Sequence, residues 1–165
     1  ELLGRAAGMD ISAAENLRLA APLHDIGKIG IPDAILNKPG SHTPEETITM
    51  RSHAQLGAQM LGNSKRPLLQ LAARICLEHH ENWDGSGYPR GLQGEVISLE
   101  GRIVALADVF DALGSTRVYK APWPRERIRD FLIEQTGRKF DPHLIDLLFA
   151  RWDDAEALRE QYPDS

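Results

Sequence analysis

Apolar residues recur at helical spacing along almost the whole chain, and the first such stripe follows a polar start signal. Ser12 and Glu15 have the spacing of a capping box, in which a hydroxyl and a carboxylate satisfy backbone N–H groups at a helix start. The pattern predicts a helix from there to about Lys28. Four residues at i, i+3, i+4 and i+7 share its inward face: Leu17, Ala20, Ala21 and His24. A histidine therefore stands where a core residue is expected.

A second start signal lies at Thr43, Pro44 and Glu46, where proline takes the first helical position and costs no hydrogen bond. The predicted helix reaches Leu61 before a Gly-Asn pair ends it. Five residues share its inward face: Met50, His53, Leu56, Gly57 and Met60. Here too a histidine lies on the inward stripe.

The third predicted helix begins near Pro67 and ends at the pair His79 and His80. Residues 81–95 contain four glycines and one proline, a composition typical of a loop. A fourth helix follows Ser98. Its apolar face includes an acidic side chain, and its members are Val104, Ala105, Asp108 and Ala112, with Asp111 beside them.

Two further helices complete the pattern, one from about Pro124 to Thr136 and one from Pro142 onward behind the cap candidate Asp141. No segment shows sustained strand alternation, and the sequence has no internal repeat or low-complexity tract. The chain is therefore predicted to be all-α, with residues 1–165 in one domain.

Composition is that of an ordinary globular domain and narrows the range of partners. With 165 residues, of which 42% are hydrophobic, the chain can bury a core without a disulfide or a metal. The single cysteine, Cys76, cannot form an internal disulfide, so a cytoplasmic setting is the simplest interpretation. No apolar run is long enough to span a bilayer. The net charge of −5 and the lack of a dense Lys/Arg cluster argue against a nucleic-acid polymer as partner, but not against a small anionic ligand.

Ionisable side chains on inward helix faces need partners, because a polar or charged group that is buried alone costs free energy. Helices of a bundle can direct imidazoles and carboxylates into one pocket, where such groups bind zinc, manganese or iron. Convergence on a metal would therefore explain all of these residues together. The candidate ligands are His24, Asp25, His53, His79, His80 and Asp108.

Each candidate also has an ordinary structural interpretation. A buried histidine such as His53 is more often hydrogen-bonded than metal-bound. Asp108 could pair with Arg102 or Arg117, and a pair of histidines at a helix end suits the helix dipole. Because these explanations must all hold at once, metal binding is favoured. The other two histidines stand beside turn residues and are assigned to the solvated surface: His42 and His143.

Ordered motifs extend through nearly the whole chain. They are Leu23-His-Asp-Ile-Gly-Lys-Ile-Gly-Ile-Pro32, then His53, then His79-His80-Glu81 leading into Asp84-Gly-Ser-Gly-Tyr-Pro-Arg-Gly-Leu92, then residues 102–113, 117–120 and 137–142. This set resembles the HD-GYP subfamily of the HD phosphohydrolases. A His-Asp pair alone is a weak signal, but the ordered set with its spacings is specific.

The resemblance implies a helical bundle around two or three divalent metal ions, iron or manganese. It also implies hydrolysis of the bacterial second messenger cyclic di-GMP, or a related cyclic dinucleotide, to pGpG, GMP or both. By motif position, the six candidate ligands above bind the metals. Lys28 lies at the scissile phosphate, Arg117 and Lys120 hold the phosphates of the ligand, and Tyr88 belongs to the name-giving triplet.

The implied chemistry suits these residue types. Hydrolysis of a phosphodiester needs a strong nucleophile and neutralised charge on both sides of phosphorus, which two metals about 3.5–4 Å apart supply. Asp25 is the natural bridging carboxylate. Lys28 either stabilises the developing charge or protonates the leaving oxygen.

The Gly-rich loop supports three interpretations of Tyr88. Its glycines permit close backbone approach to a ligand, and Trp83 and Tyr88 offer aromatic faces on which guanine can stack. Alternatively, the loop only orients His79 and His80. As the resemblance implies, it could also contact other signalling proteins.

The sequence departs from those family members that place a further glutamate and histidine on a helix before the His-Asp pair. No histidine precedes His24, so the first ligand-bearing helix is expected upstream of Glu1. The resemblance further implies that the domain is the output unit of a longer two-component regulator. The competing hypothesis is a module that binds cyclic dinucleotides or partner proteins without turnover, through an incomplete metal site.

Overall fold

The computed structural model describes residues 1–115 and 121–161, and these residues form helices joined by loops, without a β-strand. The predicted all-α class is confirmed. The α-helices of the described residues are α1 (Leu2–Ala6), α2 (Ile11–Ala20), α3 (Asp33–Leu36), α4 (Pro44–Arg51), α5 (His53–Gly62), α6 (Pro67–Glu78), α7 (Leu99–Gly114), α8 (Arg125–Glu134), α9 (Pro142–Ala150) and α10 (Trp152–Gln161). Short 3-10 segments are η1 (Ala21–Leu23), η2 (Ile26–Gly30) and η3 (Gly94–Val96).

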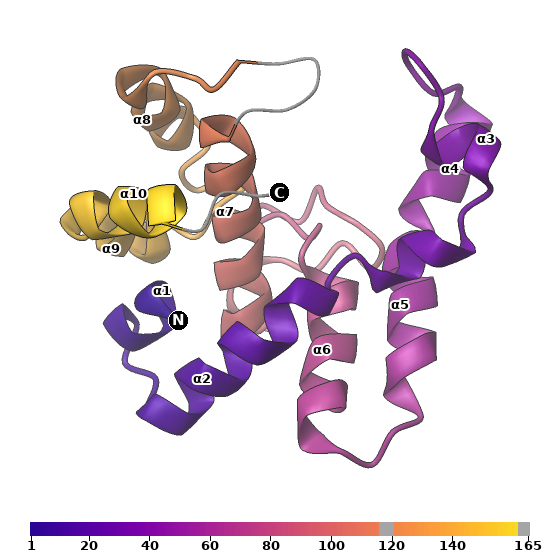
Figure 1. Cartoon of the computed structure of the whole chain (residues 1–165), viewed down its shortest axis with the longest axis horizontal. Coiled ribbons are helices and arrows are strands. Elements are labelled where there is room, and N and C mark those ends of the chain that lie inside the picture. Colours follow the sequence, from indigo (N-terminus) through magenta and orange to yellow (C-terminus); the bar gives the residue numbers. More distant parts are fainter. Residues whose placement is uncertain (116–120, 162–165) are drawn as a thin grey trace.

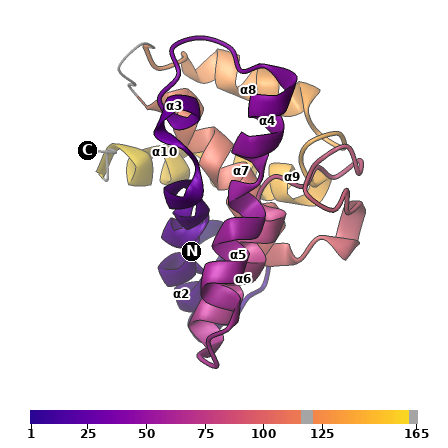
Figure 2. The same cartoon turned by 90° about the vertical axis from the view of Figure 1, so that its right-hand side faces the viewer.

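Helix α7 lies in the middle of the molecule, with the paired helices α5 and α6 on one side and α8, α9 and α10 on the other (Figure 1). Turning the molecule shows α4 and α5 one after the other and α5 beside α6 (Figure 2). The largest shared core joins α2, α6, α7, α8, α9 and α10 through buried apolar side chains such as Leu17, Ile75, Leu106, Ile128 and Leu148. Burial of these apolar side chains favours folding.

Several start signals act as the sequence predicts. The Thr43 hydroxyl accepts from the Glu46 N–H, and the Glu46 carboxylate accepts from the Thr43 N–H, which completes the capping box of α4. The side chains of Ser98 and Asp141 cap α7 and α9. These polar groups satisfy N–H groups that have no partner within the helix.

The predicted helix from Ser12 to Lys28 is wrong at both ends. Asp10 caps α2 by accepting the Ala13 N–H at 2.7 Å, so the helix begins at Ile11 without the Ser12 capping box. It ends at Ala20, and the chain continues as 3-10 segments through the Pro- and Gly-containing residues 21–30. Proline and glycine both disfavour the continuation of an α-helix.

Two other predicted helices are each divided. The helix expected from Pro44 to Leu61 breaks at Ser52, so His53 begins a new helix, and Met60, expected to face inward, is 54% exposed. The helix expected from Pro142 onward breaks at Arg151. His42, expected on the solvated surface, is half-buried against the Ile35 carbonyl. Within the described residues, no helix is long and apolar enough to cross a membrane.

Candidate metal centre

The candidate ligands come from segment ends that the fold brings together. His24 and Asp25 lie between η1 and η2, and His53 is the first residue of α5. His79 and His80 follow the last residue of α6, which packs along α5. The backbone conformation is less restricted at a helix end than inside a helix. Side chains from several segment ends can therefore point into one small volume.

Gly27 allows the close packing that brings Asp25 to His53. Segment η2 lies against the start of α5, and a Cβ atom on Gly27 would overlap the backbone oxygen of His53 and the backbone nitrogen of Gly57. Only glycine leaves this contact open. The absence of a side chain at Gly27 therefore allows the backbones of η2 and α5 to approach each other.

The Asp25 carboxylate lies at the centre of the cluster. Its Oδ1 is 3.3 Å from His53 Nε2 and 3.6 Å from His79 Nε2. Its Oδ2 is 3.4 Å from His24 Nε2 and 2.6 Å from the Lys28 ammonium. Each carboxylate oxygen thus faces a different set of nitrogen atoms.

The opposite ring nitrogen fixes the orientation of three of these imidazoles. Nδ1 of His24 lies 2.8 Å from the Ala21 carbonyl, and Nδ1 of His53 lies 2.7 Å from the Met50 carbonyl. Nδ1 of His79 lies 3.0 Å from the Cys76 carbonyl. A neutral imidazole that donates from Nδ1 presents the lone pair of Nε2, which is the form that binds a metal.

The chemistry of these groups fits a cation. Two buried atoms, Asp25 Oδ1 and His79 Nε2, have no hydrogen-bond partner among residues 1–115 and 121–161, although buried polar atoms are normally paired. Ligand atoms about 2.1 Å from one ion lie roughly 3.0–3.5 Å apart, close to the separations around Oδ1. The residues that offer ligand atoms within 4.8 Å of one another are Asp25, His53, His79 and His80.

His24 and Asp108 extend the cluster on the Oδ2 side. Asp108 Oδ1 lies 3.7 Å from His24 Nε2, and its side chain is 40% exposed. Arg102, one of the partners considered for Asp108, instead binds Asp141 at 2.6 Å. All six expected ligands therefore lie in one neighbourhood: Asp25 at the centre, three imidazoles on its Oδ1 side, and His24 and Asp108 on its Oδ2 side.

The chain matches a known protein family over most of its length. The family model described as HD domain matches residues 1–144. The chain belongs to the HD domain family. This confirms the resemblance to the HD phosphohydrolases that the ordered motifs indicate.

Relatives with curated names extend beyond this HD domain. A 3'3'-cGAMP-specific phosphodiesterase of Vibrio cholerae is 49% identical over 164 residues, which are 99% of this chain and 31% of that protein. A cyclic di-GMP phosphodiesterase response regulator of Xanthomonas campestris is 48% identical over 147 residues, covering 89% of this chain and 39% of that protein. The chain spans about a third of the length of these relatives.

A solved structure shares the fold of this HD domain. The crystal structure of a cyclic GMP-AMP specific phosphodiesterase of Vibrio cholerae superposes with a TM-score of 0.64 at 20% sequence identity. The match covers 94% of this chain and 42% of that one. This chain therefore shares its helical arrangement with part of that phosphodiesterase.

The electrostatics of the cluster keep Asp25 ionised and His80 neutral. Burial alone would raise the pKa of Asp25, but its interactions with three imidazoles and Lys28 outweigh burial and hold that pKa far below its ordinary value. Burial, and then the neighbouring His79 and His53, lower the pKa of His80 to about 2. His80 is therefore a neutral imidazole, unlike the cationic helix-end histidine considered from the sequence.

His24 behaves differently from His80. Burial disfavours its charged form, but interactions with Asp25, the Ala21 carbonyl and Asp108 exceed that effect and raise its pKa. Its two carboxylate neighbours explain the difference. The carboxylates of Asp25 and Asp108 thus favour the charged form of His24, whereas burial and the neighbouring imidazoles disfavour the charged form of His80.

Two buried glutamates near the site, Glu78 and Glu81, are not among the residues that the sequence predicts for it. The Glu81 carboxylate accepts the backbone N–H groups of Arg90 at 2.8 Å and Leu92 at 2.9 Å. The Glu78 carboxylate accepts from the Arg90 guanidinium and from the Ser98 N–H, each at 2.8 Å. An acidic pair beside a Gly-rich loop was the available signal, because such a loop has backbone N–H groups that need acceptors.

The remaining candidates lie around the cluster or outside the described residues. Lys28 binds Asp25, and its side chain is 42% exposed. The Tyr88 ring stacks on the ring of His80. Arg117 and Lys120, expected at the phosphates of the ligand, fall outside the described residues.

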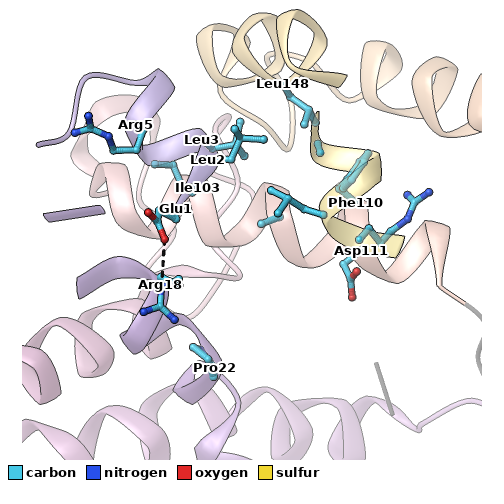
Figure 3. A pocket seen from close by; sticks show the side chains of 14 residues that line it. Glu1, Leu2, Leu3, Arg5, Arg18, Pro22, Ile103, Phe110, Asp111 and Leu148 are labelled. Carbon is cyan, nitrogen blue, oxygen red and sulfur yellow. Dashed lines mark ion pairs between the residues drawn. The ribbon is translucent and has the colours of Figure 1, made fainter. Parts of the chain in front are cut away.

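A large cavity of about 980 Å³ lies elsewhere, between α1, α2, α7, α9 and α10 (Figure 3). Its walls are mainly apolar, and Glu1 pairs with Arg18 at 3.2 Å at its edge. None of the six candidate ligands lines it. The cavity is therefore separate from the cluster around Asp25.

Proposed function

We propose that this HD domain is a metal-dependent phosphodiesterase that hydrolyses a cyclic dinucleotide. The observation that carries the proposal is the Asp25 carboxylate, whose two oxygens face different sets of imidazole nitrogens. Relatives at 45–50% identity are named cyclic di-GMP or 3'3'-cGAMP phosphodiesterases, which supports the substrate class. The length of these relatives supports a role as the output unit of a longer signalling protein.

The proposed cofactor is a pair of divalent ions, iron or manganese, and Asp25 would offer one carboxylate oxygen to each. His53, His79 and His80 would hold the ion on the Oδ1 side, and His24 and Asp108 the ion on the Oδ2 side. Such ions supply a hydroxide at neutral pH and offset the charge of the phosphate. A third ion would need ligands beyond these six.

Lys28 is the proposed acid or electrostatic group of the reaction. Its ammonium lies 2.6 Å from Asp25 Oδ2, and its partly exposed side chain leaves it accessible to a bound phosphate. From there it can donate a proton to the leaving oxygen or stabilise charge on the phosphate. Arg117 and Lys120 are proposed to bind the phosphates of the same ligand.

The proposed reaction opens the ring of the dinucleotide. Water adds to one phosphorus, the P–O3′ bond breaks, and the leaving 3′ oxygen takes a proton. Cyclic di-GMP then gives linear pGpG, and a second hydrolysis gives GMP. The same chemistry applies to 3′3′-cGAMP, because the bond that breaks is of the same type.

Product analysis tests this function. Metal-free protein is loaded with Mn²⁺ or Fe²⁺, incubated with cyclic di-GMP or 3′3′-cGAMP, and the nucleotides are separated by chromatography. We expect linear products from the loaded protein and none from Asp25→Asn, which keeps the shape of the side chain but removes its charge. Absence of product with both metals and both substrates would overturn the proposal.

A further inference from the structure

Three of the four imidazoles around Asp25 Oδ1 and Oδ2 are oriented by a backbone carbonyl, and the fourth member of the cluster, His80, is held differently. Within the described residues, no backbone carbonyl accepts a hydrogen bond from the ring of His80; its Nε2 lies 3.1 Å from His53 Nε2. A ligand whose ring can rotate loses entropy when it binds a metal. Something else must therefore fix the ring of His80.

The Gly-rich loop folds back onto His80. The Tyr88 N–H donates to the His80 carbonyl at 3.1 Å, and the two ring centroids are 4.7 Å apart with planes inclined by 19°. Gly87 makes this return feasible, because a Cβ there would overlap the His80 carbonyl oxygen and the Asn82 nitrogen. Backbone and ring of Tyr88 thus both contact the same histidine.

The far parts of the loop are anchored independently of any ligand. Glu81 binds the N–H groups of Arg90 and Leu92, and Glu78 binds the Arg90 side chain. Along the chain, Tyr88 lies between the pair His79-His80 and the anchored residues Arg90 and Leu92. The loop is therefore held by buried carboxylates in the position that places the ring of Tyr88 on His80.

A second side chain also contacts the ring of Tyr88. The guanidinium carbon of Arg51, at the end of α4, lies 4.7 Å from the ring centroid of Tyr88. This is a cation–π distance. The ring of Tyr88 thus already has two partners, His80 and Arg51, with which a guanine base would compete.

We propose that Tyr88 is a positioning residue, which holds the His80 imidazole in its metal-binding orientation and thereby sets the metal affinity of the cluster. The proposal rests on the proposed function in taking His80 as a ligand. It assigns the aromatic ring of the loop to the metal centre and not to base stacking. Arg51 contributes by holding the ring of Tyr88 from α4.

The test compares Mn²⁺ affinity of metal-free protein by titration calorimetry, without any nucleotide. Tyr88→Leu removes the ring, and we expect roughly tenfold weaker Mn²⁺ binding, the scale of losses when support for a metal ligand is removed. Tyr88→Phe keeps the ring and should bind within about twofold of the wild type. Trp83→Leu is the matched control: it removes a ring of the same loop that contacts Arg102, and Mn²⁺ affinity should stay unchanged.

A double-mutant cycle separates positioning from a general effect on the fold. In the His80→Ala background, Tyr88→Leu should cause no further loss of Mn²⁺ affinity, because the ring then has no ligand to hold. Additive losses would overturn the proposal. If the leucine variant does not fold, Tyr88→Met, which keeps the bulk without the aromatic face, serves in the same cycle.

Kinetics at saturating Mn²⁺ give an independent readout. We expect the KM of Tyr88→Leu for cyclic di-GMP to match that of the wild type. Unchanged Mn²⁺ affinity with a raised KM would instead identify the ring as a stacking surface for guanine and overturn the proposal. Failure of the proposed function is distinguishable, because it would abolish hydrolysis by the wild type but leave the calorimetric comparison intact.

Discussion

Gly27 is the position at which the fold and the candidate metal centre depend on each other most directly. In Gly27→Ala the new Cβ would overlap the backbone oxygen of His53 and the backbone nitrogen of Gly57. Neither atom can rotate away, so η2 and α5 must separate. The same separation would move Asp25 from His53, now 3.3 Å from its Oδ1.

The magnitude follows from the kind of atom that must move. Overpacking of a protein interior typically costs about 1–3 kcal/mol, and overlap with backbone places Gly27→Ala near the upper value, about 3 kcal/mol. At roughly 2–4 °C per kcal/mol for a chain of this size, Tm should fall by about 6–12 °C. Mn²⁺ affinity should fall as well, because Asp25 and His53 share a proposed ion.

Gly30→Ala is the matched control in the same segment. Its Cβ would lie 3.0 Å from the Leu56 Cδ1, the end of a side chain that can rotate away. We expect its Tm to stay within about 2 °C of the wild type. Thermal unfolding of metal-free protein, followed by circular dichroism, measures both variants. Equal stability of the two variants, or a Gly27→Ala protein as stable as the wild type, would refute the packing argument.

Three further predictions concern the rest of the chain. Asp141→Ala should lower the free energy of unfolding, measured by urea titration, by about 3–5 kcal/mol. The substitution removes the carboxylate partner of the Arg102 guanidinium and the side-chain cap of α9. A loss below about 1 kcal/mol would contradict this prediction. Burial, and then the Asp25 charge, raise the pKa of Cys76 to about 11, so iodoacetamide at pH 8 should label it only in unfolded protein, as mass spectrometry would show. EDTA should leave the far-ultraviolet circular dichroism unchanged, since the core is apolar; loss of helix would show a structural metal.

The sequence predicts the helices with strong caps and misses the local breaks. The helix after Ser98 and the capping box at Thr43 are observed because their signals are local hydrogen bonds. Hydrophobic spacing continues through Ser52 and through residues 21–30, although the backbone changes direction there. Hydrophobic periodicity indicates which side of a helix faces the core, but it does not indicate where the helix axis changes direction.

The candidate ligands could be assembled from the sequence, but their supports could not. His24, His53 and His79 stand out as polar residues on inward faces, and the His-Asp pair adds Asp25. The carbonyls that orient their rings and the reach of Glu81 to Arg90 depend on tertiary contacts. Residue type predicts which groups need partners, and only the fold decides which partners they meet.

The Asp25 cluster is proposed to bind divalent ions that support hydrolysis of a cyclic dinucleotide. The most direct measurement titrates metal-free protein with Mn²⁺ and records both bound ions and cyclic di-GMP hydrolysed at each step. We predict that hydrolysis rises with Mn²⁺ loading and that Asp25→Asn loses both Mn²⁺ binding and hydrolysis. Hydrolysis without bound metal, or full Mn²⁺ binding by Asp25→Asn, would contradict the account.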